Sequence, residues 1–243
     1  MDEIPVLCTI WDVPLRVKPA ILANFVGLWG LMAWLAGRGR PHRSWSRRLA
    51  TGALTTLALF AADIGHALAH IVSARYAGAP MDEIVLSEGM PRTLYHDNDV
   101  PPRAPRLRAL GGPVYSALGL LVSTILRWLA PQGSATHEVA GWSCLGHGLI
   151  LTGSLVPLPI VDGGTILKWT LVEKGATPDE ADRTVRKANG ILGAAATVAG
   201  LAVATAPSPS GRPQGSAMRR WLPALGLLAV GGIGIATALD KIR

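Results

Sequence analysis

Three ionisable side chains lie close together in an otherwise apolar stretch, residues 49–72. They are Asp63, His66 and His70, and an α-helix, at about 100° of turn per residue, brings all three to one stripe. Imidazole nitrogens and carboxylate oxygens bind divalent metals and carry protons. Inside a membrane such groups are costly unless they pair, bind an ion or line a wet cavity. The spacing therefore predicts a metal-binding or proton-handling face on this helix.

Another carboxylate follows a break in a second apolar segment. Residues 139–157 predict a membrane span that contains His147, and the chain then continues through Pro157 and Pro159. Because proline cannot continue a regular helix, we expect the backbone to unwind just before Asp162. A carboxylate on unwound backbone at membrane depth needs a cavity or a protein-lined pocket.

The elements that must position these groups are membrane-spanning helices. Charged residues make up 16% of the chain and hydrophobic residues 49%, a balance typical of polytopic membrane proteins. Six apolar runs predict six transmembrane helices. They cover residues 20–36, 50–72, 109–130, 139–157, 189–206 and 221–239. The predicted fold class is an all-α polytopic membrane protein with about six transmembrane helices and a short β-hairpin or strands at the membrane surface. Residues 83–88 and 92–97 would form the hairpin.

The basic charge of the chain favours lipid over nucleic acid as its partner. The net charge is +7, but the lysines and arginines lie in loops between the apolar runs, where lipid headgroups are near. The two cysteines, Cys8 and Cys144, predict neither a disulfide framework nor a thiolate zinc site. We expect an integral, multi-pass protein of the plasma membrane that contacts lipids and other transmembrane proteins and does not bind nucleic acid. Its oligomeric state does not follow from the sequence.

Three parts are predicted along the chain. Residues 1–19 alternate apolar and polar side chains near their end, which predicts an entry strand, and residues 20–188 form the membrane core. Residues 189–243 add two further transmembrane helices, joined by a linker rich in proline, glycine and serine at residues 207–218.

Four short motifs follow one another along these parts. They are DVPLRVKP at residues 12–19, ADIGH at 62–66, GPVYS at 112–116 and SLVPLPIVDG at 154–163. In this order they resemble the entry strand, His-Glu-x-Gly-His, Gly-Pro-x-x-Asn and Asn-x-x-Pro-x-x-x-x-Asp-Gly of the site-2 protease family of intramembrane zinc metallopeptidases. The resemblance covers residues 11–170, so the predicted membrane core is site-2 protease-like.

The resemblance implies a zinc-dependent endopeptidase that hydrolyses transmembrane helices, with His66 and Asp162 as metal ligands. Its motifs also include supporting positions. These are Gly112, Pro113, Ser116, Ser154, Pro157 and Gly163. The chain departs from the family where Ala62 replaces the first zinc-ligating histidine and Asp63 replaces the catalytic glutamate. Serine also replaces both motif asparagines.

The residues themselves indicate a replacement ligand. His70 lies one turn beyond His66, and histidines at i and i+4 on one helix face form a workable zinc pair. One Zn²⁺ per chain, held by His66, His70 and Asp162, would keep a fourth position for water, as catalytic zinc sites do. Asp63 is then the candidate general base, and His147 a candidate to orient an oxyanion or a ligand.

Three functions stay open on this basis. The first is a zinc-dependent intramembrane endopeptidase. The second is a catalytically degenerate relative that binds transmembrane partners, which Ala62 and Asp63 favour. The third is an ion or proton transporter in which Asp63, His66, His70 and His147 relay protons. Such transporters commonly contain inverted repeats, and the sequence shows none, which counts against this function.

Overall fold

The computed structural model describes residues 4–38, 40, 42–87, 90–96, 99–205 and 216–239, and of residues 216–224 it describes the backbone only. The chain divides into two compact units, Met1–Leu155 and Val156–Arg243. Each unit is described by itself below. The predicted linker at residues 207–218 falls almost entirely outside the described residues.

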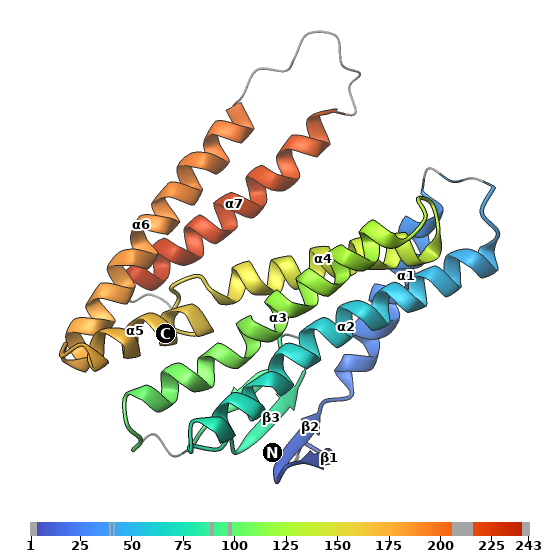
Figure 1. Ribbon diagram of the computed structural model, residues 1–243. Helices are drawn as coiled ribbons and strands as arrows, with labels where there is room; N and C mark the ends of the chain where they lie inside the picture. The colour runs from blue at the N-terminus through green and yellow to red at the C-terminus, as the bar shows by residue number, and fades with distance from the viewer. Residues whose placement is uncertain are drawn as a thin grey trace. The chain divides into compact units, whose positions relative to one another are not determined.

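Four helices form the first unit. They are α1 (Ala20–Gly37), α2 (Trp45–Tyr76), α3 (Arg103–Leu129) and α4 (Ala135–Ser154). Helix α2 is the centre of the unit, because it packs against α1, α3 and α4 (Figure 1). Serine side chains start two of the helices: Ser44 accepts a hydrogen bond from the Arg47 amide at α2, and Ser134 accepts one from the His137 amide at α4.

A four-stranded sheet covers one part of α2. Its strands are β1 (Val6–Ile10), β2 (Val13–Val17), β3 (Glu83–Leu86) and β4 (Arg92–Leu94), in the order β1-β2-β3-β4. Strands β1 and β2 form a hairpin whose turn residues Trp11 and Asp12 have positive φ, 48° and 66°, as a tight two-residue turn requires. Strands β2 and β3 pair in parallel, and β3 and β4 pair antiparallel.

The predicted strand in residues 12–19 and the predicted hairpin are confirmed by β2 and by β3 with β4, whereas β1 was not predicted. Leu15, Ile84 and Leu86 of the sheet are buried together with Ala67 and Ile71 of α2. The sheet therefore holds the same part of α2 that carries the two histidines.

The second unit contains α5 (Asp162–Glu173), α6 (Pro178–Thr205) and α7 (Ser216–Ala238). Helices α6 and α7 lie side by side (Figure 1), and a Cβ atom on Gly193 would lie 2.9 Å from the carbonyl oxygen of Gly231. The buried Asn189 side chain donates to the carbonyl of Gly234 across the same contact, at 3.1 Å. The predicted end of the core at residue 188 falls inside α6, which begins with a capping box formed by Thr177 and Glu180.

Four of the described helices are long and apolar enough to cross a membrane, namely α1, α2, α3 and α6. A mostly helical integral membrane protein with a small sheet is thus confirmed, but the predicted count of six spans is not. Helix α4 contains His137, Glu138 and His147 among its twenty residues and does not qualify. Within α7, the residues whose side chains are described, Leu225–Ala238, form an apolar stretch too short to count as a span by themselves.

Candidate metal centre

His66 and His70 lie one turn apart on α2 with their imidazole rings edge to face, 5.1 Å between centroids. Each ring is held through its Nδ1 atom. The Nδ1 atom of His66 is hydrogen-bonded to Ser116 Oγ at 2.9 Å, and the Nδ1 atom of His70 donates to the backbone carbonyl of Arg108 at 2.8 Å. Because a carbonyl only accepts, neutral His70 carries its proton on Nδ1 and has its lone pair on Nε2.

Gly112 of α3 makes room for the Nε2 atoms of both rings. A Cβ atom on Gly112 would lie 2.3 Å from Nε2 of His66 and 2.5 Å from Nε2 of His70. Both nitrogens therefore converge on one place beside the α3 backbone. Ser116, one turn further along α3, is fully buried and supplies the partner of His66. The next residue after Gly112, Pro113, is accommodated inside α3 although it cannot donate to the carbonyl of Ala109.

This arrangement fits a divalent metal such as zinc. A metal-binding histidine commonly donates its other ring nitrogen to a carbonyl or a carboxylate, which fixes the tautomer and the ring orientation. His70 has this arrangement, and His66 has a hydroxyl in the same place. Each of His66, His70 and Asp162 offers one atom of a kind that zinc binds.

Asp162 belongs to the second unit and is the first residue of α5. Helix α4 ends at Ser154 and residues 155–161 form no helix, so the unwinding predicted at Pro157 and Pro159 is confirmed. The glycines after Asp162 are buried, and a Cβ on Gly164 would lie 1.9 Å from the carbonyl oxygen of Leu158. The Asp-Gly-Gly sequence thus lets the unwound segment fold against the first turn of α5. Asp162 as a metal ligand stays a prediction.

The remaining motif position in this region is Ser154, which stands where the resembling family has asparagine. Its side chain is buried, and its hydroxyl donates to the carbonyl of Leu151 in its own helix at 3.2 Å. The hydroxyl thus closes the last turn of α4 before the chain unwinds.

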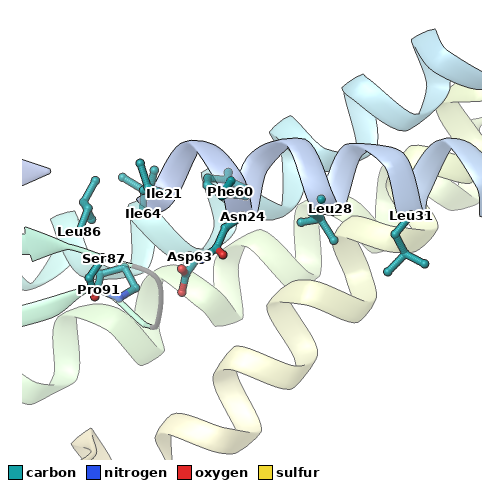
Figure 2. Close-up of a pocket in the computed structure, with 12 residues that line it drawn as sticks. Ile21, Asn24, Leu28, Leu31, Phe60, Asp63, Ile64, Leu86, Ser87 and Pro91 are labelled. Carbon is teal, nitrogen blue, oxygen red and sulfur yellow. The ribbon is translucent and has the colours of Figure 1, made fainter. Parts of the chain in front are cut away.

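Asp63 lines a cavity of about 480 Å³ between α1 and α2 (Figure 2). The cavity walls are largely apolar, and its polar side chains are Asp63, Asn24 of α1 and Ser87 just after β3. Asp63 and Asn24 come from facing helices and lie beside each other in Figure 2. Asp63 is half-buried, so its carboxylate is open to whatever fills the cavity. Ala62, its neighbour, is completely buried and offers no ligand atom.

His147 lies on a different helix from the histidine pair. It is buried on α4, 7% exposed, and its ring packs on α3, where a Cβ on Gly119 would lie 2.2 Å from Cε1. Gly119 is seven residues from Gly112, about 10 Å along the helix. The Nδ1 atom of His147 has no hydrogen-bond partner among the described residues, and its ring lies 5.7 Å from that of Tyr115. The role of His147 in orienting an oxyanion or a ligand stays a prediction.

Two residues at the site were missed by sequence reasoning. Arg108 is 4% exposed, donates through Nε to the carbonyl of Ala79 at 2.7 Å and lies over the Tyr95 ring at 4.4 Å. An arginine in a proline-rich segment before a span gives no signal of such burial. Asn24 does have a signal, because it is the one amide side chain in the apolar helix α1.

No protein-family model matches the sequence, and neither does any curated protein. Among solved structures the chain is similar to the site-2 protease from Methanocaldococcus jannaschii, with a TM-score of 0.50 and 15% identity. The match covers 95% of this chain and 94% of that chain. At this identity the likeness concerns the fold alone, and it supports a site-2 protease-like membrane fold.

Proposed function

We propose that this protein is a zinc-dependent intramembrane endopeptidase that hydrolyses transmembrane helices of other proteins in the plasma membrane. The observation that carries the proposal is the convergence of His66 Nε2 and His70 Nε2 beside Gly112, with both Nδ1 atoms held. Two imidazoles prepared in this way inside a membrane protein favour metal binding over a purely structural role.

We propose Asp162 as the third ligand. The carboxylate begins α5 directly after an unwound segment, where its backbone is not constrained by a preceding helical turn. When bound, zinc acts as a Lewis acid that acidifies water and polarises a carbonyl group. Two histidines and one carboxylate are a ligand set found in zinc hydrolases.

Asp63 has the role of general base in this proposal. Its carboxylate, on the same helix as His66 and His70, would take a proton from the attacking water while the water oxygen bonds to the carbonyl carbon. The same proton can then pass to the departing amine when the peptide C–N bond breaks. Asp63 is one methylene shorter than glutamate, and an error of about 1 Å in such a position can cost about a hundredfold in rate.

The substrate must reach the site without its helical hydrogen bonds. A carbonyl inside a membrane helix is already bonded to an amide four residues away, so the cleaved bond must lie in an unwound stretch. The apolar cavity walls, which include Leu28 and Phe60, suit the side chains of such a stretch.

A second function is favoured by one observation. Alanine has no ligand atom, so Ala62, which is fully buried, leaves the position of the resembling family's first ligand unfilled. A protein that keeps the fold and binds transmembrane partners without cutting them would tolerate this change.

Cleavage of a model transmembrane substrate separates the two functions. The purified chain is placed in proteoliposomes with a fluorescent single-span substrate, and products are followed on gels. We expect cleavage that zinc chelation and Asp63→Asn both abolish. A chain that holds zinc but never cleaves would favour the non-cutting relative instead.

A further inference from the structure

One end of the first unit is strongly basic. It contains residues 37–48, which connect α1 to α2, and residues 127–141, which connect α3 to α4. An ion pair between Arg40 and Glu138 joins the two connections, which lie at the same end of the unit in Figure 1. Glu138 is the one acidic residue of the two segments, against six arginines. These are Arg38, Arg40, Arg43, Arg47, Arg48 and Arg127.

Three of the arginines hold this end together. Arg40 and Arg43 both pair with Glu138, Arg43 at 2.8 Å. Arg43 also donates to the carbonyl of Ala36 at 2.9 Å. Arg48 donates through Nε to the carbonyl of Arg43, also at 2.9 Å. The connection between α1 and α2 is therefore fixed by its own side chains, before any ligand binds.

The other three arginines present their charge to the surroundings. Arg38, Arg47 and Arg127 are exposed, and none of them pairs with an acidic side chain among the residues that the structure describes. The guanidinium of Arg38 lies over the ring of Trp34, 5.2 Å from its centroid. Exposed cations on a preformed surface attract anionic groups.

Exposed tryptophans place this surface at the depth of lipid headgroups. Trp34, Trp45 and Trp128 are 57%, 71% and 82% exposed, and they lie at the basic ends of α1, α2 and α3. Tryptophan is enriched where hydrocarbon meets water, because its ring is apolar and its N–H is polar. All three helices are long and apolar enough to cross a membrane. The anions nearest to these arginines are therefore lipid phosphates, and this favours lipid over nucleic acid.

We propose that this end of the first unit binds the headgroups of anionic phospholipids through Arg38, Arg47 and Arg127. A guanidinium can donate two parallel hydrogen bonds to one phosphate group. A zwitterionic headgroup carries its own ammonium and is attracted less. Exposed apolar side chains of α1 and α2, such as Leu31 and Leu49, would contact the acyl chains. The inference goes beyond the proposed function and does not depend on it, because no residue of the metal centre takes part.

Native mass spectrometry of the full-length chain tests the inference. The protein in detergent receives equal amounts of phosphatidylglycerol and phosphatidylcholine with the same acyl chains, and the adducts of each lipid are compared. We expect the wild type to retain phosphatidylglycerol about tenfold more than phosphatidylcholine. The triple variant Arg38→Gln, Arg47→Gln and Arg127→Gln should retain both lipids equally.

Two further variants serve as controls. The first removes three exposed basic side chains outside both segments, by Arg92→Gln, Arg103→Gln and Lys187→Gln. Its net charge equals that of the first triple variant, and it should keep the full preference. The second control places lysine at the three proposed positions, which keeps the charge but loses the paired hydrogen bonds, and it should keep part of the preference. Melting curves show that each variant remains folded.

Several results would overturn the inference. A wild type that retains both lipids equally would do so, as would a first triple variant that keeps the preference. Equal losses in the two glutamine variants would mean that only the total charge matters. Displacement of phosphatidylglycerol by excess inorganic phosphate would indicate a site for a soluble anion. A wild type that ignores both lipids but shifts single-stranded DNA in a gel would assign this surface to nucleic acid.

Discussion

His70 Nδ1 donates to the backbone carbonyl of Arg108 at 2.8 Å, which ties the second histidine of α2 to the beginning of α3. The same carbonyl accepts from Ser73 Oγ at 2.8 Å. Arg108 is itself fixed, because its guanidinium binds the carbonyls of Ala79 and Pro80. The ring orientation of His70 therefore depends on how α3 begins, and the metal site depends on contacts well outside it.

Gly112→Ala should destroy metal binding while leaving the helices folded. The new Cβ would lie 2.3 Å and 2.5 Å from the Nε2 atoms of His66 and His70, so both rings must move. We expect zinc affinity, measured by competition with a fluorescent chelator, to fall at least about tenfold, as for other changes that disturb ligand orientation. Gly119→Ala is the matched control, because its Cβ meets His147 and not the pair. Equal affinity losses in both variants would contradict the proposed site.

Ser116→Ala should weaken metal binding through His66 alone. The hydroxyl at 2.9 Å holds Nδ1 of His66, and losing such an outer partner costs about 10- to 100-fold in metal affinity. The same titration measures the effect. Ser123→Ala removes another buried hydroxyl of α3, one that bonds only to its own helix, and should leave affinity unchanged. If Ser116→Ala binds zinc as the wild type does, His66 is not positioned as described.

Asp63→Asn should abolish turnover and spare the metal. The amide cannot accept the proton of the attacking water, and general-base removal costs about 10²- to 10⁴-fold in rate. The cleavage assay gives the rate, and elemental analysis gives the zinc content. Asp63→Glu, which restores the longer side chain, should keep activity. Full activity in Asp63→Asn would assign the base to another group.

Arg108→Met should lower stability. It leaves the carbonyl of Ala79 without its buried donor and removes the cation from the Tyr95 ring. One lost buried hydrogen bond to a charged group costs about 2 kcal/mol, which corresponds to a fall of about 4 to 8 °C in the apparent melting temperature. Thermal unfolding in detergent measures this change in melting temperature. Arg106→Met, two residues earlier on α3, is the comparison variant and should change the melting temperature less.

Much of this fold could be predicted from the sequence because its signals are local. Apolar runs located α1 and α2, alternation located β2, and Pro157 with Pro159 located the unwound segment. Strand β1 was missed because the turn that joins it to β2, at Trp11 and Asp12, contains no glycine to mark a hairpin. Alternation in Val13–Val17 showed only the second strand. The count of six spans stays a prediction, because α4 places polar groups inside the unit, which lowers its apolarity.

The candidate site was only partly predictable for a related reason. The stripe of Asp63, His66 and His70 follows from helical periodicity, but the contacts that hold the rings come from another helix. Nothing local shows that the carbonyl of Arg108 meets His70, because the partners are 38 residues apart. Nothing in the sequence of α3 shows that Gly112 makes room for imidazole rings.

The most direct test of the central claim is the zinc content of the detergent-purified protein, measured beside His66→Ala, His70→Ala and Asp162→Ala. We expect about one zinc ion per wild-type chain, lost in all three variants and retained in His137→Ala, whose histidine lies at the start of α4. X-ray absorption at the zinc edge should show nitrogen and oxygen ligands at about 2.0–2.2 Å and no sulfur. Wild-type protein purified without any zinc, and unable to bind it when titrated at neutral pH, would contradict the account.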